Sequence, residues 1–165
     1  MVGQGVIQAV SVVGLGSIGR RHVRVMRALF PDLRIVGVSS RPIEELPPNS
    51  VPTMVVTTKD QAVRLGVEAA IICSPAPLHV SDALFFLRKE TPVLIEKPLA
   101  DSVEAALALQ SGQTRGMSVL LGYTLRHSEA FTSFARLLSE RRIGKTLGAR
   151  IVSRSYLPAW RPEQD

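Results

Sequence analysis

Residues 6–22 of this 165-residue chain read VIQAVSVVGLGSIGRRH, and this stretch decides the fold. An apolar, β-branched run ends abruptly in three glycines, Gly14, Gly16 and Gly19, and a helix-compatible segment follows over residues 20–30. Gly14 allows dihedrals that a side chain would forbid, Gly16 lets a ligand approach the backbone, and Gly19 lets the helix pack tightly on the strand. The pattern therefore predicts a strand, a glycine turn and a helix.

The start of this helix suits an anionic ligand. Unpaired backbone N–H groups and the positive end of the helix dipole face outward there, which favours a diphosphate. A glycine spacing of this kind, with a strand before it and a helix after it, predicts a dinucleotide-binding turn, whereas a plain strand–turn–helix is the alternative. The residues that we expect to bind the cofactor at this turn are Gly14, Gly16, Ser17, Ile18 and Gly19.

Composition narrows the class of protein. Hydrophobic residues make up 45% of the chain and charged residues 21%, as in a globular domain. The net charge is +6, but aromatic residues are only 5%, so we expect anionic small molecules and no nucleic acid as partners. Cys73, the single cysteine, lies in an apolar run and predicts a buried thiol in a reducing, cytoplasmic compartment. We expect no membrane span and no signal peptide.

The segments after the first helix alternate between strand and helix patterns. Apolar runs predict strands at 33–38, 53–58, 67–73, 93–95 and 117–121, the last of them buried. Helices are expected at 60–65, 79–89 and 101–110, the last opened by a capping box from Asp101 to Glu104. Residues 42–52, with four prolines, predict a loop. The fold class is therefore α/β, a doubly wound parallel sheet of the Rossmann type that binds NAD(P).

The pattern changes after Tyr123, so we divide the chain into a dinucleotide-binding domain at 1–123 and a second part at 124–165. An amphipathic helix is expected at 128–141 and an alternating strand at 147–155. One strand cannot make a domain, so this part predicts the truncated start of a C-terminal α/β domain. Apolar side chains left without partners there would make the chain a homo-oligomer: Leu147, Ile151, Tyr156, Leu157 and Trp160.

The residues after the second strand bear on the choice of cofactor. Where NAD is bound, an acidic residue usually follows this strand and holds the ribose hydroxyls. Here Ser39, Ser40 and Arg41 follow instead, and hydroxyls with a guanidinium suit a 2′-phosphate. We therefore expect NADP in preference to NAD. The alternative is that Arg41 stacks on adenine or lies in solvent.

Four motifs occur in a characteristic order: Gly14-Leu-Gly-Ser-Ile-Gly-Arg-Arg-His22, Ser74-Pro-x-x-x-His79, Glu96-Lys97-Pro98 and Tyr123-x-x-Arg126. Together they resemble the Gfo/Idh/MocA (glucose–fructose oxidoreductase and inositol dehydrogenase) family, over about residues 5–157. The resemblance implies a Rossmann domain that holds NAD(P) and a C-terminal α/β domain that binds a sugar or polyol.

The resemblance also implies roles for individual residues. Lys97 is the expected catalytic residue, whose ammonium stabilises the developing alkoxide while also contacting the cofactor. Glu96 would fix the position of Lys97, and Arg126 would hold the cofactor or orient Lys97. Ser74, Pro75 and His79 would line the nicotinamide ribose side, although a histidine at a helix start is as often a cap or a core residue.

The chain departs from the family at its end. Members usually carry a second catalytic group, a histidine of the C-terminal domain, and His127 is the last histidine here. The sequence therefore predicts an NADP-dependent dehydrogenase acting on a carbohydrate or nucleotide-sugar, represented mainly by its cofactor domain and poorly active alone. The alternative is a non-catalytic dinucleotide-binding module. No metal site is predicted.

Overall fold

The computed structural model describes residues 6–40, 47–112 and 116–153. The chain divides into two compact units, Met1–Tyr123 and Thr124–Asp165. The sequence motifs that predict dinucleotide binding lie in the first unit, apart from Arg126, which belongs to the second.

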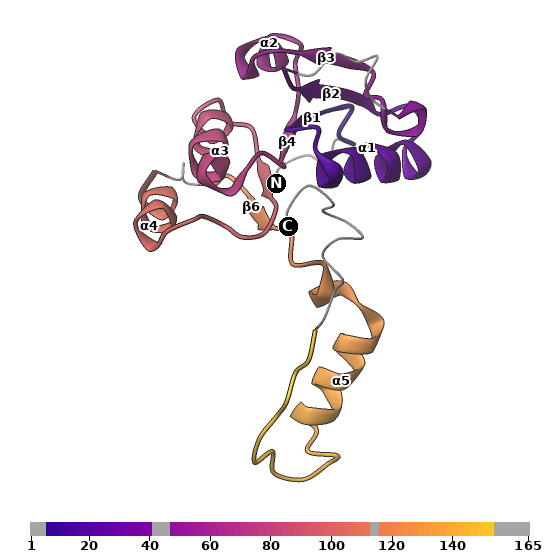
Figure 1. Cartoon of the computed structure of the whole chain (residues 1–165), viewed down its shortest axis with the longest axis vertical. Helices are drawn as coiled ribbons and strands as arrows, with labels where there is room; N and C mark the ends of the chain where they lie inside the picture. The colour runs from indigo at the N-terminus through magenta and orange to yellow at the C-terminus, as the bar shows by residue number, and fades with distance from the viewer. Residues whose placement is uncertain (1–5, 41–46, 113–115, 154–165) are drawn as a thin grey trace, which may run out of the picture. The chain divides into compact units, whose positions relative to one another are not determined.

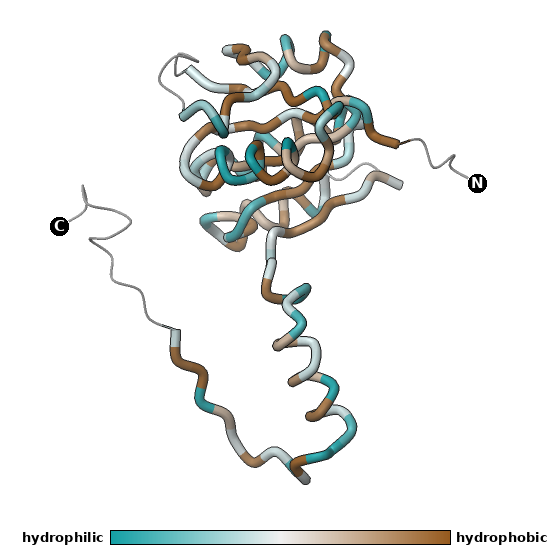
Figure 2. The backbone as a smooth tube through the Cα atoms, turned by 90° about the vertical axis from the view of Figure 1, so that its right-hand side faces the viewer, coloured by the Kyte–Doolittle hydropathy of each residue, from teal (hydrophilic) through white to brown (hydrophobic). Residues whose placement is uncertain are grey.

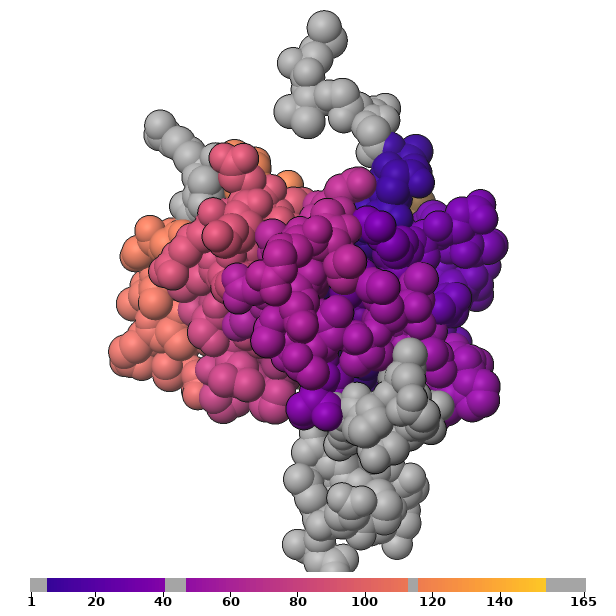
Figure 3. All heavy atoms as spheres, turned by 90° about the horizontal axis from the view of Figure 1, so that it is seen from above, coloured from indigo at the N-terminus to yellow at the C-terminus, as the bar shows by residue number. Residues whose placement is uncertain are grey.

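Six strands, formed by described residues of the first unit, build one fully parallel sheet (Figure 1). They are β1 (Ala9–Val13), β2 (Arg34–Val38), β3 (Met54–Val56), β4 (Ala69–Ile72), β5 (Val93–Ile95) and β6 (Val119–Leu121). Their order in the sheet is β3-β2-β1-β4-β5-β6. Seen from above in Figure 3, the unit therefore runs from indigo and purple on one side to orange on the other. The doubly wound parallel sheet predicted from the sequence is confirmed.

Helices connect the strands, as parallel pairing requires. The first unit contains α1 (Ser17–Leu29), α2 (Lys59–Arg64), α3 (His79–Leu87) and α4 (Val103–Gly112), with short 3-10 turns η2 (Pro48–Ser50) and η3 (Ala76–Leu78). The four α-helices begin within three residues of the positions that the sequence predicts. The predicted loop at 42–52 falls partly outside the described residues, and η2 occupies its end.

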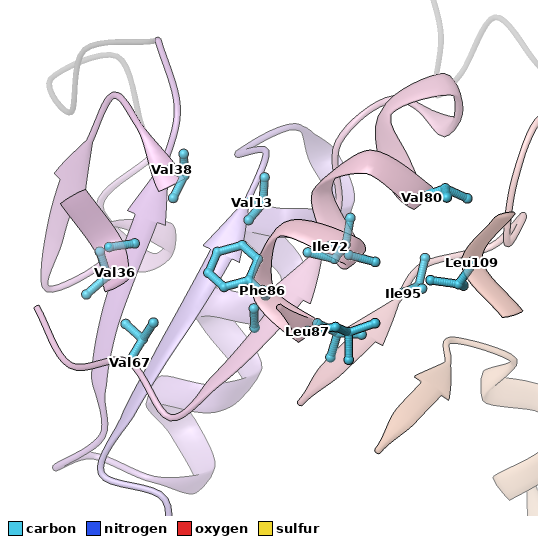
Figure 4. Packing of buried hydrophobic residues seen from close by; sticks show 14 residues of the cluster. Val13, Val36, Val38, Val67, Ile72, Val80, Phe86, Leu87, Ile95 and Leu109 are labelled. Carbon is cyan, nitrogen blue, oxygen red and sulfur yellow. The ribbon is translucent and has the colours of Figure 1, made fainter. Parts of the chain in front are cut away.

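The larger core lies on the face of the sheet that α2, α3 and α4 cover. Phe86 of α3 is fully buried and sits among side chains of β1, β4 and the segment before β4 in Figure 4. Leu87, one residue further, packs toward β5 and α4. Burial of each such side chain contributes about 1.5–3 kcal/mol, and this face contains the larger number of buried apolar residues.

The opposite face carries a smaller core beneath α1. Val10 and Val12 point to this side, because alternate residues of a strand face opposite ways, and they meet Val23 of α1. Ser11, between them, faces the larger core and is fully buried; among the described residues its hydroxyl is a polar atom with no hydrogen-bond partner.

Two helix starts show how local sequence sets the bounds. Thr58 caps α2, and its reciprocal hydrogen bonds with Gln61 form a capping box. The box predicted from Asp101 is not formed: α4 begins at Val103, and the Ser102 hydroxyl caps it by accepting from the N–H of Ala105 at 3.1 Å, but alanine has no side-chain acceptor to complete a box. A serine hydroxyl reaches the third N–H of a helix as well as a carboxylate does, so Asp101 is not needed as the cap.

The last strand of the sheet differs from its prediction. We expected a buried strand at 117–121, but β6 is the edge strand, and its Leu120 is 61% exposed. Among the strands of the described residues, β5 alone pairs with it. The apolar run at 117–121 thus predicted the strand correctly, but its predicted burial is wrong. Burial of an edge strand depends on which other segments pack against that edge of the sheet.

The second unit contains η4 (Thr124–His127) and α5 (Glu129–Ser139). The expected helix at 128–141 is confirmed, and Figure 2 shows apolar and polar residues alternating along it. The expected strand at 147–155 is wrong over its described part: residues 147–153 form no strand, and Leu147 and Ile151 are about 90% exposed. An alternating sequence forms a strand only where a neighbouring strand completes its hydrogen bonds. Tyr156, Leu157 and Trp160 lie outside the described residues.

In the described part of the chain, no helix combines the length and the apolar character needed to cross a membrane.

Candidate functional site

The candidate site lies where the strand order reverses, between β1 and β4, at the carboxyl ends of both strands. Ligands of open α/β sheets bind at such points because the flanking connections diverge there. Gly14 follows β1 with φ +87°, and a Cβ on it would lie 2.7 Å from the carbonyl oxygen of Cys73, after β4. A Cβ on Gly19 would collide with the Gly14 carbonyl. The two glycines thus let β1, α1 and β4 meet closely.

Gly16 has a different role from its two neighbours in the motif. It is the N-cap of α1, with an extended conformation open to any residue, and a Cβ there would meet nothing within 4 Å. Among the described residues, no side chain caps α1 and no acidic residue lies in its first turn. The N–H groups around the exposed Ser17 therefore face open space with positive potential. The open space at Gly16 and the positive potential both suit a diphosphate.

The remaining residues of the expected cofactor site lie around this turn. Ile18 is half-buried against the core beneath α1. Ser39 and Ser40 follow β2, and the N–H of Gly14 bonds to Val38 at the end of that strand, so the serines lie beside the glycine turn. Arg41 lies outside the described residues.

A buried charge network supports the loop after β4. Asp82 of α3 is only 6% exposed and accepts hydrogen bonds from the Ser74 hydroxyl at 2.7 Å and from the Lys59 ammonium. Lys59, at the start of α2, also lies 5.1 Å from the centre of the Phe85 ring. Pro75, next to Ser74, is exposed at the same edge. The network fixes Ser74 where it faces the end of the sheet.

His79, the first residue of α3, is held between two loops. Its ring is buried, with Nδ1 2.7 Å from the carbonyl oxygen of Pro98 and Nε2 2.7 Å from that of Ser74. A neutral imidazole donates one such hydrogen bond and an imidazolium donates both. Both ring nitrogens are engaged with the protein, which favours the core-residue alternative for His79 over direct contact with a ribose.

The Glu-Lys-Pro triplet begins where β5 ends. Glu96 is buried, and its carboxylate lies 2.8 Å from Nε2 of His22 and 3.3 Å from the backbone nitrogen of Lys97. Lys97 and Pro98 are exposed and are joined by a cis peptide bond. The structure thus presents one exposed cation at the carboxyl edge of the sheet, after a strand that pairs with β4.

Cys73 lies in the close contact between the glycine turn and β4. Its thiol is buried, as predicted. Burial, together with the nearby negative charge of Glu96, raises the pKa of the thiol to about 12. A thiol that stays protonated is a poor nucleophile, so Cys73 serves packing here.

A groove of about 660 Å³ lies beside the triplet. Its walls come from the start of α4, the residues that precede it and one aromatic residue after β6: Pro98, Leu99, Ala100, Asp101, Ser102, Val103, Ala106, Leu107, Gln110 and Tyr123. The groove is mainly apolar with a few polar groups, which is typical of a surface that receives a partly apolar ligand or chain segment.

Sequence reasoning assigned no role to three residues that the structure places in the site. His22 lies within the quoted glycine motif, three residues after Gly19, and the helical spacing puts it on the same face of α1. Lys59 and Asp82 belong to no motif and come together only through the packing of α2 and α3.

Arg126, the remaining residue of the predicted cofactor site, lies on η4 in the second unit. In the described residues, no three His, Cys, Asp or Glu side chains are grouped as metal ligands.

Comparison with known proteins agrees with the resemblance predicted from the sequence. Residues 9–120 match the Gfo/Idh/MocA family model, described as an oxidoreductase family with an NAD-binding Rossmann fold. Inositol 2-dehydrogenase of Streptomyces avermitilis is 29% identical over 145 residues, which cover 84% of this chain and 42% of that protein. The same enzyme of Rubrobacter xylanophilus is 38% identical over 101 residues, or 59% of this chain and 29% of that one.

Solved structures show the same fold. Scyllo-inositol dehydrogenase from Lactobacillus casei, with bound NAD(H) and scyllo-inositol, superposes with a TM-score of 0.68 at 20% identity, over 84% of this chain and 43% of that one. A probable dehydrogenase from Thermotoga maritima gives 0.72 at 18% identity, over 83% and 42%. The chain thus spans less than half the length of these similar proteins.

Proposed function

Because this chain belongs to the Gfo/Idh/MocA oxidoreductase family, we propose that it is the cofactor-binding part of an NAD(P)-dependent dehydrogenase acting on a polyol or sugar. The observation that carries the proposal is the presence, at one edge of the sheet, of an open helix N-terminus at Gly16 and an exposed lysine, Lys97. The first suits a diphosphate, and the second suits an oxygen that gains negative charge.

The residues of the glycine turn would hold the dinucleotide. Gly14, Gly16, Ser17, Ile18 and Gly19 form the turn and the first residues of α1, where N–H groups bind the diphosphate. Once bound, the nicotinamide would accept or supply the hydride of the reaction. These residues contribute binding and orientation only, because none of them carries an acid or a base.

Lys97 would be the catalytic residue, with Ser74 and Pro75 on the nicotinamide side. Its ammonium donates a hydrogen bond to the hydroxyl or ketone oxygen of the substrate and stabilises that oxygen as negative charge develops. An exposed side chain on a fixed main chain can do this, and Glu96 fixes the main chain next to it. Arg126, which belongs to the second unit, stays a prediction as a cofactor-binding residue.

The substrate class follows from the relatives. The similar proteins of Streptomyces and Rubrobacter are inositol dehydrogenases, and a similar structure holds scyllo-inositol. We propose a cyclic polyol, a sugar or a nucleotide-sugar as the substrate of the whole protein. The reducing, cytoplasmic compartment predicted above is part of the same proposal, since the single cysteine is a buried thiol.

The chain of 165 residues, assayed alone, would turn over poorly. Its last histidine is His127, and the chain covers about 42% of the length of its relatives. A non-catalytic dinucleotide-binding module is the second candidate, favoured by the open helix N-terminus at Gly16 in the described residues. The exposed Leu147 and Ile151 also support self-association as a homo-oligomer, which light scattering would detect.

NADP is the proposed cofactor, because Ser39, Ser40 and Arg41 suit a 2′-phosphate. The test is a parallel calorimetric titration of the chain with NADPH and NADH at fixed salt. We expect tighter binding of NADPH, weakened about tenfold by Arg41→Ala with little change for NADH. Arg24→Ala, on the exposed side of α1, is the matched control and should change neither. Equal binding of both cofactors would remove the preference, and binding of neither would contradict the proposed function for this chain.

A further inference from the structure

The main chain around Lys97 has little support from the sheet. The N–H of Glu96 donates to Ile72 at 3.0 Å and is the last ladder bond of β5 on that side. Lys97 is exposed, and Pro98 has no N–H to donate. The position of Lys97 therefore depends on contacts made by side chains near it.

His22 supplies the first of these contacts, from the face of the sheet that α1 covers. Its Nε2 lies 2.8 Å from Oε1 of Glu96, whose other oxygen accepts from the Lys97 N–H at 3.3 Å. The carboxylate also fills the space beside Gly122, where a Cβ would lie 3.0 Å from it. The Glu96 side chain is thus held in a slot between α1 and the end of β6.

His79 supplies the second contact, from the opposite face of the sheet. It begins α3, is 2% exposed, and places Nδ1 2.7 Å from the carbonyl oxygen of Pro98. Its Nε2 contacts the carbonyl of Ser74, which follows β4. The residue after Lys97 is therefore tied to the neighbouring loop.

We propose that His22 and His79 are positioning residues for Lys97, one acting through Glu96 and the other through the carbonyl of Pro98. The two rings come from helices on opposite faces of the sheet and meet the residues directly before and after one exposed lysine. Burying a carboxylate and an imidazole costs free energy that an apolar pair would not, so core packing alone does not require them. The role in catalysis rests on the proposed function of Lys97.

His22 also joins Lys97 to the cofactor turn. It lies three residues after Gly19 on α1, the helix whose N-terminus faces the proposed diphosphate. A rigid helix passes a small displacement of its first turn to a residue one turn later. His22 is therefore the contact between α1, at whose start the proposed diphosphate site lies, and the residue before Lys97.

The test measures amide hydrogen exchange at Lys97 by NMR in the whole 165-residue chain. His22→Leu removes the donor to Glu96, and we expect exchange of the Lys97 amide to rise about tenfold. His22→Gln keeps an N–H at the position of Nε2 and should restore exchange to within about threefold of the original chain. For His79, leucine removes both contacts, while asparagine keeps a donor in place of Nδ1 and should restore most of the protection.

Two controls separate positioning from general loss of stability. The amide of Val12, in the central strand β1, reports global opening and should change little. His127→Leu makes the same substitution at an exposed histidine of the second unit and should leave Lys97 unchanged. If His22→Leu fails to fold, His22→Asn replaces it, because its shorter side chain does not reach Glu96, and we expect the same rise at Lys97. If His79→Leu fails to fold, His79→Ala replaces it, because alanine also lacks both ring nitrogens.

Unchanged exchange at Lys97 in His22→Leu and His79→Leu, or equal rises with leucine and with the conservative variants, would overturn the proposal. The same samples are titrated with NADPH, so the two proposals fail separately. Absence of NADPH binding in the original chain contradicts the proposed function, while the exchange ratios still decide the role of the histidines. Normal NADPH binding with unchanged exchange removes only the positioning role.

Discussion

Replacing Asp82 by asparagine removes the buried charge that joins Lys59 to Ser74, and we expect the first unit to lose about 2 kcal/mol of stability. Breaking a buried ion pair commonly costs about 3–5 kcal/mol. The cost is lower here for two reasons. The Lys59 side chain is 28% exposed and regains water, and asparagine still accepts the hydrogen bond from the Ser74 hydroxyl.

The reciprocal change, Lys59→Met, should cost about 3 kcal/mol. It leaves the Asp82 carboxylate, whose side chain is only 8% exposed, with Ser74 as its partner in the network, and it removes the cation from the Phe85 ring. In the double variant neither charge remains, so its cost should be well below the sum of the two single costs. We expect a coupling free energy of about 2 kcal/mol between the two positions.

Urea unfolding followed by far-ultraviolet circular dichroism measures all four proteins of this cycle. The loss in Asp82→Asn corresponds to a decrease of roughly 4–8 °C in Tm for a chain of this size. Asp32→Asn, at an exposed turn, is the matched control and should change the stability by less than about 0.5 kcal/mol. Additive effects of the two substitutions, with a coupling below about 0.5 kcal/mol, would refute the buried network.

Three further predictions concern other parts of the first unit. Because the Cys73 thiol has its pKa raised from 9.0 to about 12 by burial, the unfolded chain loses this proton first as the pH rises above about 9. The free energy of unfolding should then fall by about 1.4 kcal/mol for each pH unit up to about pH 12. In Cys73→Ala, urea unfolding at a series of pH values should show only the slope that the other groups cause. Parallel pH profiles for the original chain and Cys73→Ala would contradict the prediction. Ser11→Ala removes a buried hydroxyl without a partner and should be neutral or stabilising by up to about 1 kcal/mol in the same assay, whereas a clear loss would mean that the hydroxyl is bonded. Gly14→Ala should cost more than about 2 kcal/mol of stability, because φ is +87° and the new Cβ would lie 2.7 Å from a carbonyl oxygen. Gly16→Asp should keep the stability within about 0.5 kcal/mol. The same substitution should weaken NADH binding more than tenfold, because the new carboxylate repels the diphosphate. Strong NADH binding by Gly16→Asp would rule out the turn as the binding site.

The sequence predicted the parts of the fold that local chemistry decides. The spacing of Gly14, Gly16 and Gly19 limits the backbone to a turn between strand and helix, and the structure contains that turn. The order of strands and helices followed from the alternation of apolar runs, and the Cys73 thiol is buried as expected.

The parts that failed depend on partners far along the chain. The pattern at 147–153 alternates like a strand, yet no strand among the described residues completes its hydrogen bonds. Leu120 is apolar, but it lies on an edge strand. The contacts of His22 with Glu96 and of Lys59 with Asp82 join residues 74 and 23 positions apart, and no short motif reports them.

The most direct test of the cofactor site is an NMR titration of the 15N-labelled chain with NADPH. We expect the backbone amides of Gly16, Ser17 and Gly19 to shift first and most, with smaller shifts at Ser74 and Lys97, because these residues line the carboxyl edge of β1, β4 and β5. Shifts confined to the groove beside α4, or none at saturating NADPH, would contradict the claim that the glycine turn is the cofactor site of this chain.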